Sequence, residues 1–147
     1  MNALIKIVAA VMIVFTVSKA SANEKVIPFS KLPAKAQTFV KTYFKQSDVA
    51  AVTLDTEYFI QKEYAVIFKD GSKVEFDGNG AWESIDMKTS AVPATLIPQA
   101  IQRHVQKSFP DTFVQEIKQT RATYEVEISN GLDLEFSRQG EFLKVDD

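Results

Sequence analysis

One pattern of apolar and polar residues occurs twice along the chain, over residues 64–76 and 124–136. In each copy, apolar and polar residues alternate, a turn that ends in Gly71 or Gly131 interrupts them, and the alternation then resumes. Alternation with a period of two is typical of a β-strand with one buried face. Each copy therefore predicts a β-hairpin.

The register of the second hairpin follows from the connection that keeps its apolar residues on one face. A two-residue Asn130-Gly131 turn would place Ile128 opposite Asp133 and mix apolar with acidic side chains. A three-residue loop, with the glycine in the left-handed conformation, moves the register by one residue. Tyr124, Val126 and Ile128 then oppose Phe136, Leu134 and Leu132, and the other face receives four acids: Glu125, Glu127, Asp133 and Glu135.

We expect the same loop in the first hairpin. It places Tyr64 and Val66 opposite Phe76 and Val74 on the apolar face. The other face then carries a different set of residues from the second hairpin, namely Ala65, Ile67, Lys73 and Glu75.

A helix is predicted before each hairpin, because apolar residues recur there at helical spacing. Pro33 and Pro98 suit a first helical turn, where the backbone N–H has no helical partner. Ser30 and Thr95 are the expected N-caps. The apolar stripes comprise Leu32, Ala36, Val40, Tyr43 and Phe44 in the first helix, and Ile97, Ile101, Val105 and Phe109 in the second.

Two further strands complete each copy. One precedes the hairpin and centres on Val52 and Leu54, or on Ile117; the other follows it, over residues 81–86 and 141–146. A two-residue Gln139-Gly140 turn would pair Phe136 with Leu143, Leu134 with Val145 and Glu135 with Lys144. Trp82 and Phe142 hold equivalent places, and we expect both in the core.

The fold class predicted is α+β, with two tandem repeats of a helix and four antiparallel strands. The repeats span residues 23–91 and 92–147, and residues 87–91 link them. One helix on one small sheet buries little apolar surface. We therefore expect the repeats to join edge to edge into one eight-stranded curved sheet with both helices on one face.

The first 22 residues have the pattern of a secretory signal peptide, with Lys6, an apolar stretch over residues 7–17 and Ala20-Ser21-Ala22 as the cleavage site. A membrane-spanning helix is the alternative, but it needs about 20 apolar residues, roughly twice the length of this stretch. We expect cleavage after Ala22, no membrane span in the mature chain, and a periplasmic or secreted protein.

Charge and composition narrow the possible chemistry. Loss of residues 1–22 removes Lys6 and Lys19 and no acid, so the net charge moves from −2 to −4, which argues against a nucleic-acid partner. The chain has no cysteine and a single histidine, His104, which we interpret as a half-covered helix residue. We therefore expect no soft-metal site, no cofactor and no catalytic residues.

Residues 77–80 read Asp-Gly-Asn-Gly, like the start of a calcium loop, but the later acidic ligands of such a loop are missing. A plain turn is the preferred interpretation. Residues Tyr58, Phe59 and Ile60 belong to an insertion that only the first repeat carries. They either cover the core of the first repeat as a lid or form an exposed aromatic contact site.

The acidic face of the second hairpin is the strongest candidate for a site. In the chosen register Glu125 opposes Glu135, and Glu127 opposes Asp133. Like charges directly opposite each other destabilise a sheet. Lysines such as Lys144 could relieve the repulsion on a solvated face, or the face could dock a basic partner or a hard cation.

A family resemblance rests on residues in tandem order. They are Leu32-Pro33, Tyr64-x-Val66, Asp70-Gly71, Glu75-Phe76-Asp77, Gly80-x-Trp82 and Ile85-Asp86, then Ile97-Pro98, Tyr124-x-Val126, Asn130-Gly131, Glu135-Phe136, Gly140-x-Phe142 and Val145-Asp146. The order resembles the PepSY-like family of β-lactamase-inhibitor-like proteins from Bacteroides-type bacteria. The resemblance implies an exported protein whose curved sheet offers its uncovered face to a partner, as in β-lactamase inhibitor protein. It supplies no catalytic residue and no matching β-lactamase contact.

We therefore expect a non-catalytic, exported module that binds a protein or peptide of the cell envelope. The expected contact residues are Glu125, Glu127, Asp133, Glu135, Lys73, Glu75, Tyr58 and Phe59. The alternative is a carrier of a small molecule or of calcium, with its pocket near residues 77–80 or the Tyr58 loop.

Overall fold

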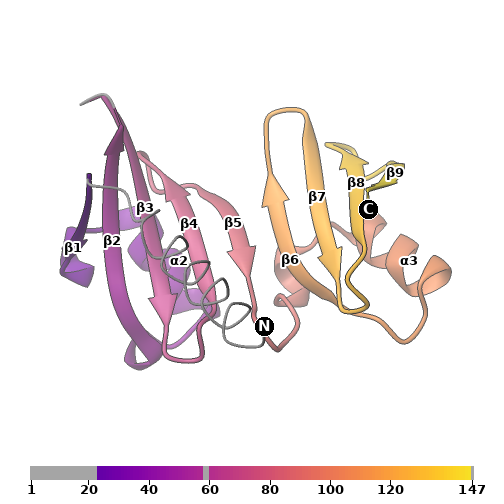
Figure 1. Ribbon diagram of the computed structural model, residues 1–147, viewed down its shortest axis with the longest axis horizontal. Coiled ribbons are helices and arrows are strands. Elements are labelled where there is room, and N and C mark those ends of the chain that lie inside the picture. Colours follow the sequence, from indigo (N-terminus) through magenta and orange to yellow (C-terminus); the bar gives the residue numbers. More distant parts are fainter. Residues whose placement is uncertain (1–22, 58–59, 147) are drawn as a thin grey trace, which may run out of the picture.

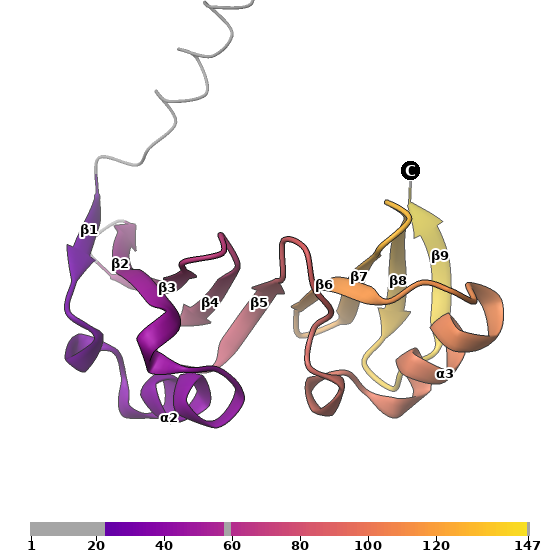
Figure 2. The same ribbon diagram turned by 90° about the horizontal axis from the view of Figure 1, so that it is seen from below.

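The computed structural model describes residues 23–57 and 60–146. The expected signal peptide and its cleavage site at Ala22 lie outside the described residues, as do Tyr58 and Phe59. The described chain forms one open antiparallel sheet of nine strands, in which the order in space equals the order in sequence (Figure 1). Helices α2 and α3 lie on the same side of this sheet (Figure 2).

The elements follow one another in two similar series. The first comprises β1 (Glu24–Ile27), η1 (Phe29–Lys31), α2 (Ala34–Tyr43), η2 (Gln46–Asp48), β2 (Val49–Glu57), β3 (Gln61–Phe68), β4 (Lys73–Asp77) and β5 (Trp82–Asp86). The second comprises η3 (Ala94–Leu96), α3 (Gln99–Ser108), β6 (Val114–Gln119), β7 (Thr123–Ile128), β8 (Asp133–Ser137) and β9 (Phe142–Asp146). The α+β class is therefore confirmed, whereas the division into repeats at residues 91 and 92 stays a prediction.

The expected number of eight strands is wrong, because β1 adds a ninth. This strand pairs with β2 through Lys25 opposite Leu54 and Ile27 opposite Val52. Its four residues do not alternate cleanly between apolar and polar, so alternation does not predict a strand there. β1 covers the backbone edge of β2 that would otherwise be unpaired.

The register of both hairpins is confirmed. Tyr64 opposes Phe76 and Val66 opposes Val74 in the first, and Tyr124 opposes Phe136 and Val126 opposes Leu134 in the second. The N–H of Ile128 bonds the carbonyl of Leu132 at 3.0 Å across the three-residue loop. Gly71 and Gly131 have φ angles of 88° and 90°, the left-handed conformation that the loop requires.

The two-residue turn expected at Gln139-Gly140 is wrong. The N–H of Ser137 bonds the carbonyl of Glu141, which encloses a loop of three residues. Leu134 pairs with Val145 and Glu135 with Lys144 as expected, but a bulge then moves Phe136 opposite Phe142 and not Leu143. The extra loop residue and the bulge compensate each other, so the rest of the register is unchanged.

The expected N-caps Ser30 and Thr95 are also wrong. The residues that precede the helices are Pro33 and Pro98, and neither makes a side-chain cap. The amide of Gln37 closes the entry turn instead, by donating to the carbonyl of Leu32 at 2.8 Å. Gln102 donates in the same way to the carbonyl of Ile97 at 2.8 Å.

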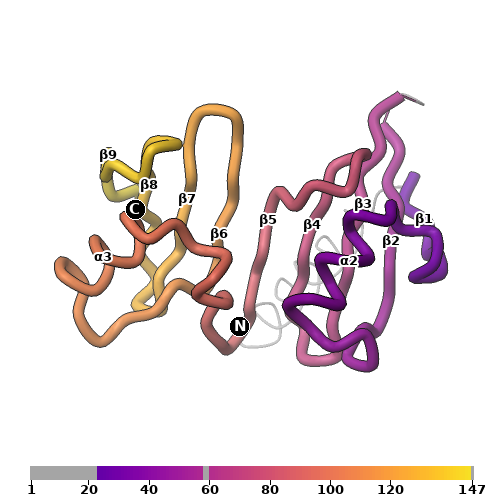
Figure 3. The backbone as a smooth tube through the Cα atoms, turned by 180° about the vertical axis from the view of Figure 1, so that it is seen from behind, coloured from indigo at the N-terminus to yellow at the C-terminus, as the bar shows by residue number. Residues whose placement is uncertain are grey.

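The core lies between the two helices and the sheet face that they cover. Ala36 and Val40 of α2, and Ile101 and Val105 of α3, are buried there as the apolar stripes predicted. Figure 3 shows this face from the helix side, with each helix in front of its own series of strands. The opposite face has no helix over it among the described residues, and it carries the charged side chains.

The two series join through β5 and β6, as the expected edge-to-edge arrangement requires. Ile85 opposes Ile117 on the helix-covered face, and Ser84 and Asp86 oppose Lys118 and Glu116 on the uncovered face. Burial of both isoleucines closes this junction, since each is fully removed from solvent.

Candidate binding surface on the uncovered face

Strand alternation and register together bring five acidic residues into one line across the uncovered face. Each is the cross-strand partner of the next, on five consecutive strands from β5 to β9. We call this line the acidic row, and its members are Asp86, Glu116, Glu127, Asp133 and Asp146. Side chains directly opposite each other lie close together, so their negative charges add.

A second line runs beside the acidic row, two residues further along each strand. It contains both signs of charge, and its members in strand order from β4 to β9 are Glu75, Ser84, Lys118, Glu125, Glu135 and Lys144. Two lysines thus border the acidic row, one near each end of the second series of strands.

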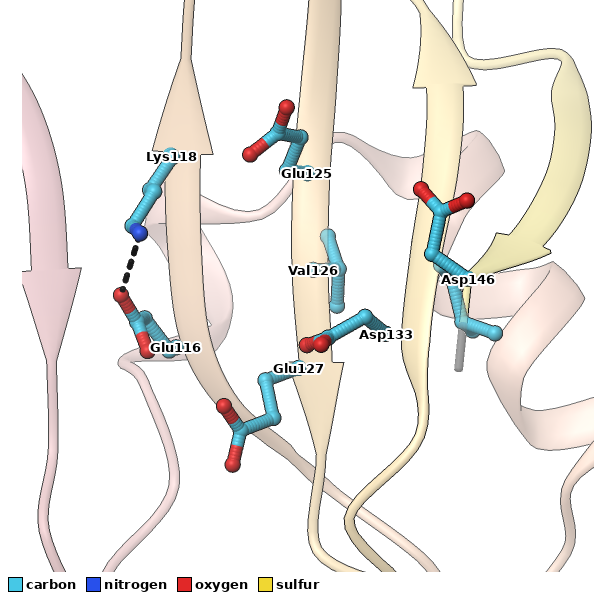
Figure 4. A pocket seen from close by; sticks show the side chains of 8 residues that line it. Glu116, Lys118, Glu125, Val126, Glu127, Asp133 and Asp146 are labelled. Carbon is cyan, nitrogen blue, oxygen red and sulfur yellow. Dashed lines mark ion pairs between the residues drawn. The ribbon is translucent and has the colours of Figure 1, made fainter.

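A hollow of about 210 Å³ opens between the two lines on β6 to β9. Figure 4 shows Glu125, Glu127 and Asp133 beside the Glu116–Lys118 pair, with Asp146 on the far strand. The hollow is lined by Glu116, Lys118, Glu125, Val126, Glu127, Asp133, Leu134 and Asp146. Five of its eight lining residues are acidic and one is basic.

The lysines neutralise only part of this surface. Lys118 pairs with Glu116 at 3.4 Å, and Lys144 pairs with Asp146 at 2.9 Å and with Glu135 at 3.6 Å. Within the described residues, Glu125, Glu127 and Asp133 form no such ion pair. The relief of repulsion expected from Lys144 is therefore confirmed for Glu135 alone among the four acids of the hairpin.

The pKa values of Glu116 and Lys118 reflect the charged side chains that surround them. Burial raises the pKa of Glu116, and Asp86 and Glu127 add repulsion that the Lys118 ammonium partly offsets. The charge of Glu116 raises the pKa of Lys118, and Glu125 and Glu75 contribute to the same shift. The hollow therefore favours a positive charge at its edge.

The first series of strands has its own acidic group on the uncovered face. A hydrogen bond to Glu75, burial, and repulsion from Glu75, Glu83 and Asp55 raise the pKa of Glu63 to about 7. Burial opposes ionisation of Glu75, but hydrogen bonds from Glu63 and Lys73 hold the pKa of Glu75 below its ordinary value. Lys73 lies 3.1 Å from Glu75.

The structure thus divides the residues expected to form the site. Glu125, Glu127 and Asp133 share the hollow, and Glu135 lies beside it on β8. Lys73 and Glu75 belong instead to the first series, where they bind each other. Ile60, next to Tyr58 and Phe59, is 88% exposed at the tip between β2 and β3, so a lid that includes Ile60 is wrong.

Four surface residues were not expected: Asp86, Glu116, Lys118 and Asp146. The signal for them was present, because Glu116 and Lys118 flank the apolar Ile117, as Asp86 follows Ile85. Only the register between β5 and β6 shows that these residues continue the line. That register depends on how the two series dock, which no short-range pattern determines.

The loop over residues 77–80 has the hydrogen bonds of a closed turn. One carboxylate oxygen of Asp77 accepts the N–H of Asn79 at 2.9 Å and the N–H of Ala81 at 3.0 Å. Asp77, Gly78, Asn79, Glu63 and Glu83 line a shallow hollow there. No group of three or more acidic or histidine side chains in the described residues has an arrangement that could hold a metal ion.

His104 is half-buried on α3, as expected, and contacts aromatic rings. Its ring meets Phe136 edge-on at 5.4 Å and stacks on Phe142 at 4.3 Å. Phe39 of α2 meets Phe76 in nearly the same edge-on geometry, at 5.5 Å. His104 therefore occupies an aromatic packing position of the core.

Trp82 is partly buried against the core, as predicted, but Phe142 remains 39% exposed.

Comparisons with known proteins agree on one family. A family model described as "Putative beta-lactamase-inhibitor-like, PepSY-like" matches residues 62–144. No curated protein matches the chain. None of the described helices is long and apolar enough to cross a membrane.

Three crystal structures of Bacteroides proteins have the same fold. A "putative calcium-regulated periplasmic protein" of Bacteroides thetaiotaomicron is 37% identical, with a TM-score of 0.82 over 87% of this chain and 100% of that one. A "putative periplasmic protein" of Bacteroides vulgatus is 37% identical, with a TM-score of 0.80 over the same shares. A second Bacteroides vulgatus protein, of unknown function, is 34% identical, with a TM-score of 0.79 over 84% and 99%.

Proposed function

We infer that this chain, which belongs to the PepSY-like family of β-lactamase-inhibitor-like proteins, is a non-catalytic binding module of the periplasm. Its partner is a protein or peptide with a basic, extended or convex surface, and the contact is made on the uncovered sheet face. The periplasmic location is supported by the descriptions of its relatives and by the signal pattern of residues 1–22.

The observation that carries this proposal is the hollow, in which three of the five acids form no ion pair among the described residues. These three acids, Glu125, Glu127 and Asp133, line the hollow on the uncovered face of the sheet. A sheet holds these charges at fixed positions, so a cationic partner gains attraction without ordering them first. The proposed contact residues remain those expected from the sequence, to which the register adds Glu116 and Asp146.

Repulsion between like charges on the uncovered face supports the same interpretation. Glu125 opposes Glu135, and Glu127 opposes Asp133, so two like-charge pairs oppose the folded hairpin. A cationic ligand would remove this repulsion on binding. The first series lacks both pairs, because Ala65 opposes Glu75 and Ile67 opposes Lys73 there.

Charge reversal at one residue tests the proposal. Glu127→Lys is expected to weaken binding of a Lys/Val-alternating decapeptide by about tenfold or more at low salt, since two unit charges change at a close contact. Glu141→Lys changes the net charge equally, but in a loop outside the hollow, and should bind nearly as wild type. Isothermal titration at two salt concentrations measures both. Equal affinities for the two variants would contradict the proposal.

Calcium binding near residues 77–80 is the second candidate. It is favoured by the description of the Bacteroides thetaiotaomicron relative as a "putative calcium-regulated periplasmic protein", whereas no group of three acidic side chains among the described residues is arranged to hold a metal ion. A cation that binds only the folded state raises its stability. Thermal melting should then shift upward at millimolar calcium in the wild type and less in Glu83→Gln. An unchanged melting temperature would rule out this candidate.

A further inference from the structure

Strand β9 occupies in the second series the place that β5 occupies in the first. Val145 opposes Leu134 as Ile85 opposes Val74, and Lys144 opposes Glu135 as Ser84 opposes Glu75. Both strands also carry a bulge at the same point. The outer edge of β5 binds β6, whereas no strand of the described chain pairs with the outer edge of β9.

The missing neighbour has a measurable effect on burial. Ile85 is fully buried because Ile117 of β6 lies beside it, but its counterpart Val145 is 42% exposed. Leu143 is 52% exposed on the same strand. An edge strand with exposed apolar side chains and unpaired backbone groups is a template for another strand. The β5–β6 junction shows how such a strand docks in this fold, antiparallel and over only three residue pairs.

The sequence of β9 is complementary to itself in that arrangement. When two β9 strands pair antiparallel about a two-fold axis at Val145, Val145 opposes the partner's Val145. Lys144 then opposes the partner's Asp146, and Asp146 opposes the partner's Lys144. Directly opposite residues share one face, so the two valines meet on the helix-covered side and the ion pairs form on the uncovered side.

We propose that the outer edge of β9 is a self-association surface, through which two copies of the chain join into one continuous sheet with two-fold symmetry. Such an interface is isologous and closes as a dimer. Moving the two-fold axis by one residue would place Lys144 opposite the partner's Lys144 or Asp146 opposite the partner's Asp146, so charge selects the register centred on Val145. The inference concerns the strand edge and is independent of what the uncovered face binds.

The dimer is weak, because three residue pairs bury far less than the roughly 1,200 Å² of a stable interface. We expect dissociation constants of about 10 μM to 1 mM. In the dimer the two acidic hollows lie on one continuous face, on either side of the paired β9 strands. A partner with two cationic segments could then contact both hollows at once.

Charge exchange across the axis provides the test. Lys144→Asp leaves two acids on each edge, and Asp146→Lys leaves two lysines, so each variant alone should remain monomeric. An equimolar mixture of the two should form a heterodimer, since every acid then opposes a lysine. The double variant K144D/D146K restores both ion pairs and should dimerise like wild type. Sedimentation equilibrium from 10 μM to 1 mM measures all four samples.

Thermal melting at low micromolar concentration, where monomers predominate, verifies that each variant is folded. Amide hydrogen exchange provides an independent reading, because β9 amides should gain protection with rising protein concentration only in samples that dimerise. A wild type that is monomeric at 1 mM would overturn the proposal. So would single variants that dimerise as strongly as wild type, or a mixture that stays monomeric.

Discussion

The imidazole of His104 stacks on the ring of Phe142, with ring centroids 4.3 Å apart and planes inclined by 15°. The same Phe142 ring also meets Phe136 edge-on at 5.7 Å. Phe142 therefore holds β9 against α3 and the core, although β9 has a neighbouring strand on only one side within the part of the chain that the structure describes.

Truncation of this ring should loosen the end of the sheet. Phe142→Ala removes two aromatic contacts from a side chain that is 39% exposed, and we expect a loss of about 2 kcal/mol in the free energy of unfolding. Leu143→Ala on the same strand, where the side chain is more exposed, should cost less than about 1 kcal/mol. Urea denaturation at low protein concentration measures both. A larger loss for Leu143→Ala would contradict this packing.

A methyl group should be poorly tolerated at Gly140. The φ angle of this residue is 86°, and an added Cβ would lie 2.7 Å from the Cβ of Ala100 at the start of α3. Gly140→Ala therefore combines backbone strain with a collision between the β8–β9 loop and the helix. Gly131 has a φ angle of 90° but open space around an added Cβ, so Gly131→Ala carries the backbone cost alone.

We expect Gly131→Ala to lower the free energy of unfolding by about 1 kcal/mol and Gly140→Ala by at least about 2 kcal/mol more. Denaturant melts of the two variants give the difference directly. Equal losses of unfolding free energy in the two variants would contradict the predicted collision between the loop and α3.

Truncation of Ser72 should stabilise the protein, whereas the preceding substitutions should destabilise it. Ser72 is 1% exposed, and its hydroxyl forms no hydrogen bond of good geometry among the described residues, although the backbone N–H and the hydroxyl of Ser72 both help to hold the pKa of Asp70 below its ordinary value. In the second hairpin Leu132 takes the corresponding place after the loop. Because an unsatisfied buried hydroxyl destabilises the fold, Ser72→Ala should raise the free energy of unfolding by about 1 kcal/mol.

Ser137→Ala is the matched control, since the Ser137 hydroxyl accepts the N–H of Glu141 at 3.1 Å. That substitution should lower the free energy of unfolding by about 0.5–1 kcal/mol. Stability changes of the same sign in both serine variants would refute the assignment of Ser72 as unpartnered.

The pKa of Glu63 predicts a pH dependence of stability. In the folded chain this pKa is raised to about 7, from 4.5. Between these two values the folded state binds more protons than the unfolded state, so this contribution to stability is full below about pH 4.5 and is lost as the pH rises through 7. Glu63→Gln should remove this loss and melt at a higher temperature than wild type at pH 8.

At pH 5 the same variant should melt close to the wild-type temperature, because wild-type Glu63 is then protonated and neutral like glutamine. Glu141→Gln, in a loop of the second series, should follow the wild type across the whole range. Parallel melting curves for wild type and Glu63→Gln from pH 5 to pH 8 would show that Glu63 does not titrate in this window.

Much of the fold could be predicted from the sequence because alternation determines which residues face the core. The register of both hairpins followed from the pairing of Val66 with Val74 and of Val126 with Leu134, and so did the opposed acids at Glu125 and Glu127. Burying apolar and exposing acidic side chains is a strong local constraint, which outweighed the preference of Asn130-Gly131 for a two-residue turn.

The parts that could not be predicted depend on contacts between distant segments. β1 is short and forms a strand because the edge of β2 is available to it. The bulge at Leu143 places Phe142 opposite Phe136, and the Phe142 ring stacks on His104 of α3, a contact that no local sequence pattern shows. The acidic row spans both series, so its length became visible only with the register of β5 and β6.

The strict strand order has a consequence for how the chain reaches this structure. Every strand pairs with the strand just before it in sequence, and the longer connections, between β1 and β2 and between β5 and β6, enclose α2 and α3. Pairings that are close in sequence lower the entropic barrier to folding. A chain of this order can add one strand at a time from its amino end, with no need to wait for a distant segment. Each newly added strand would shield the edge of the one before it, which limits aggregation while the chain folds.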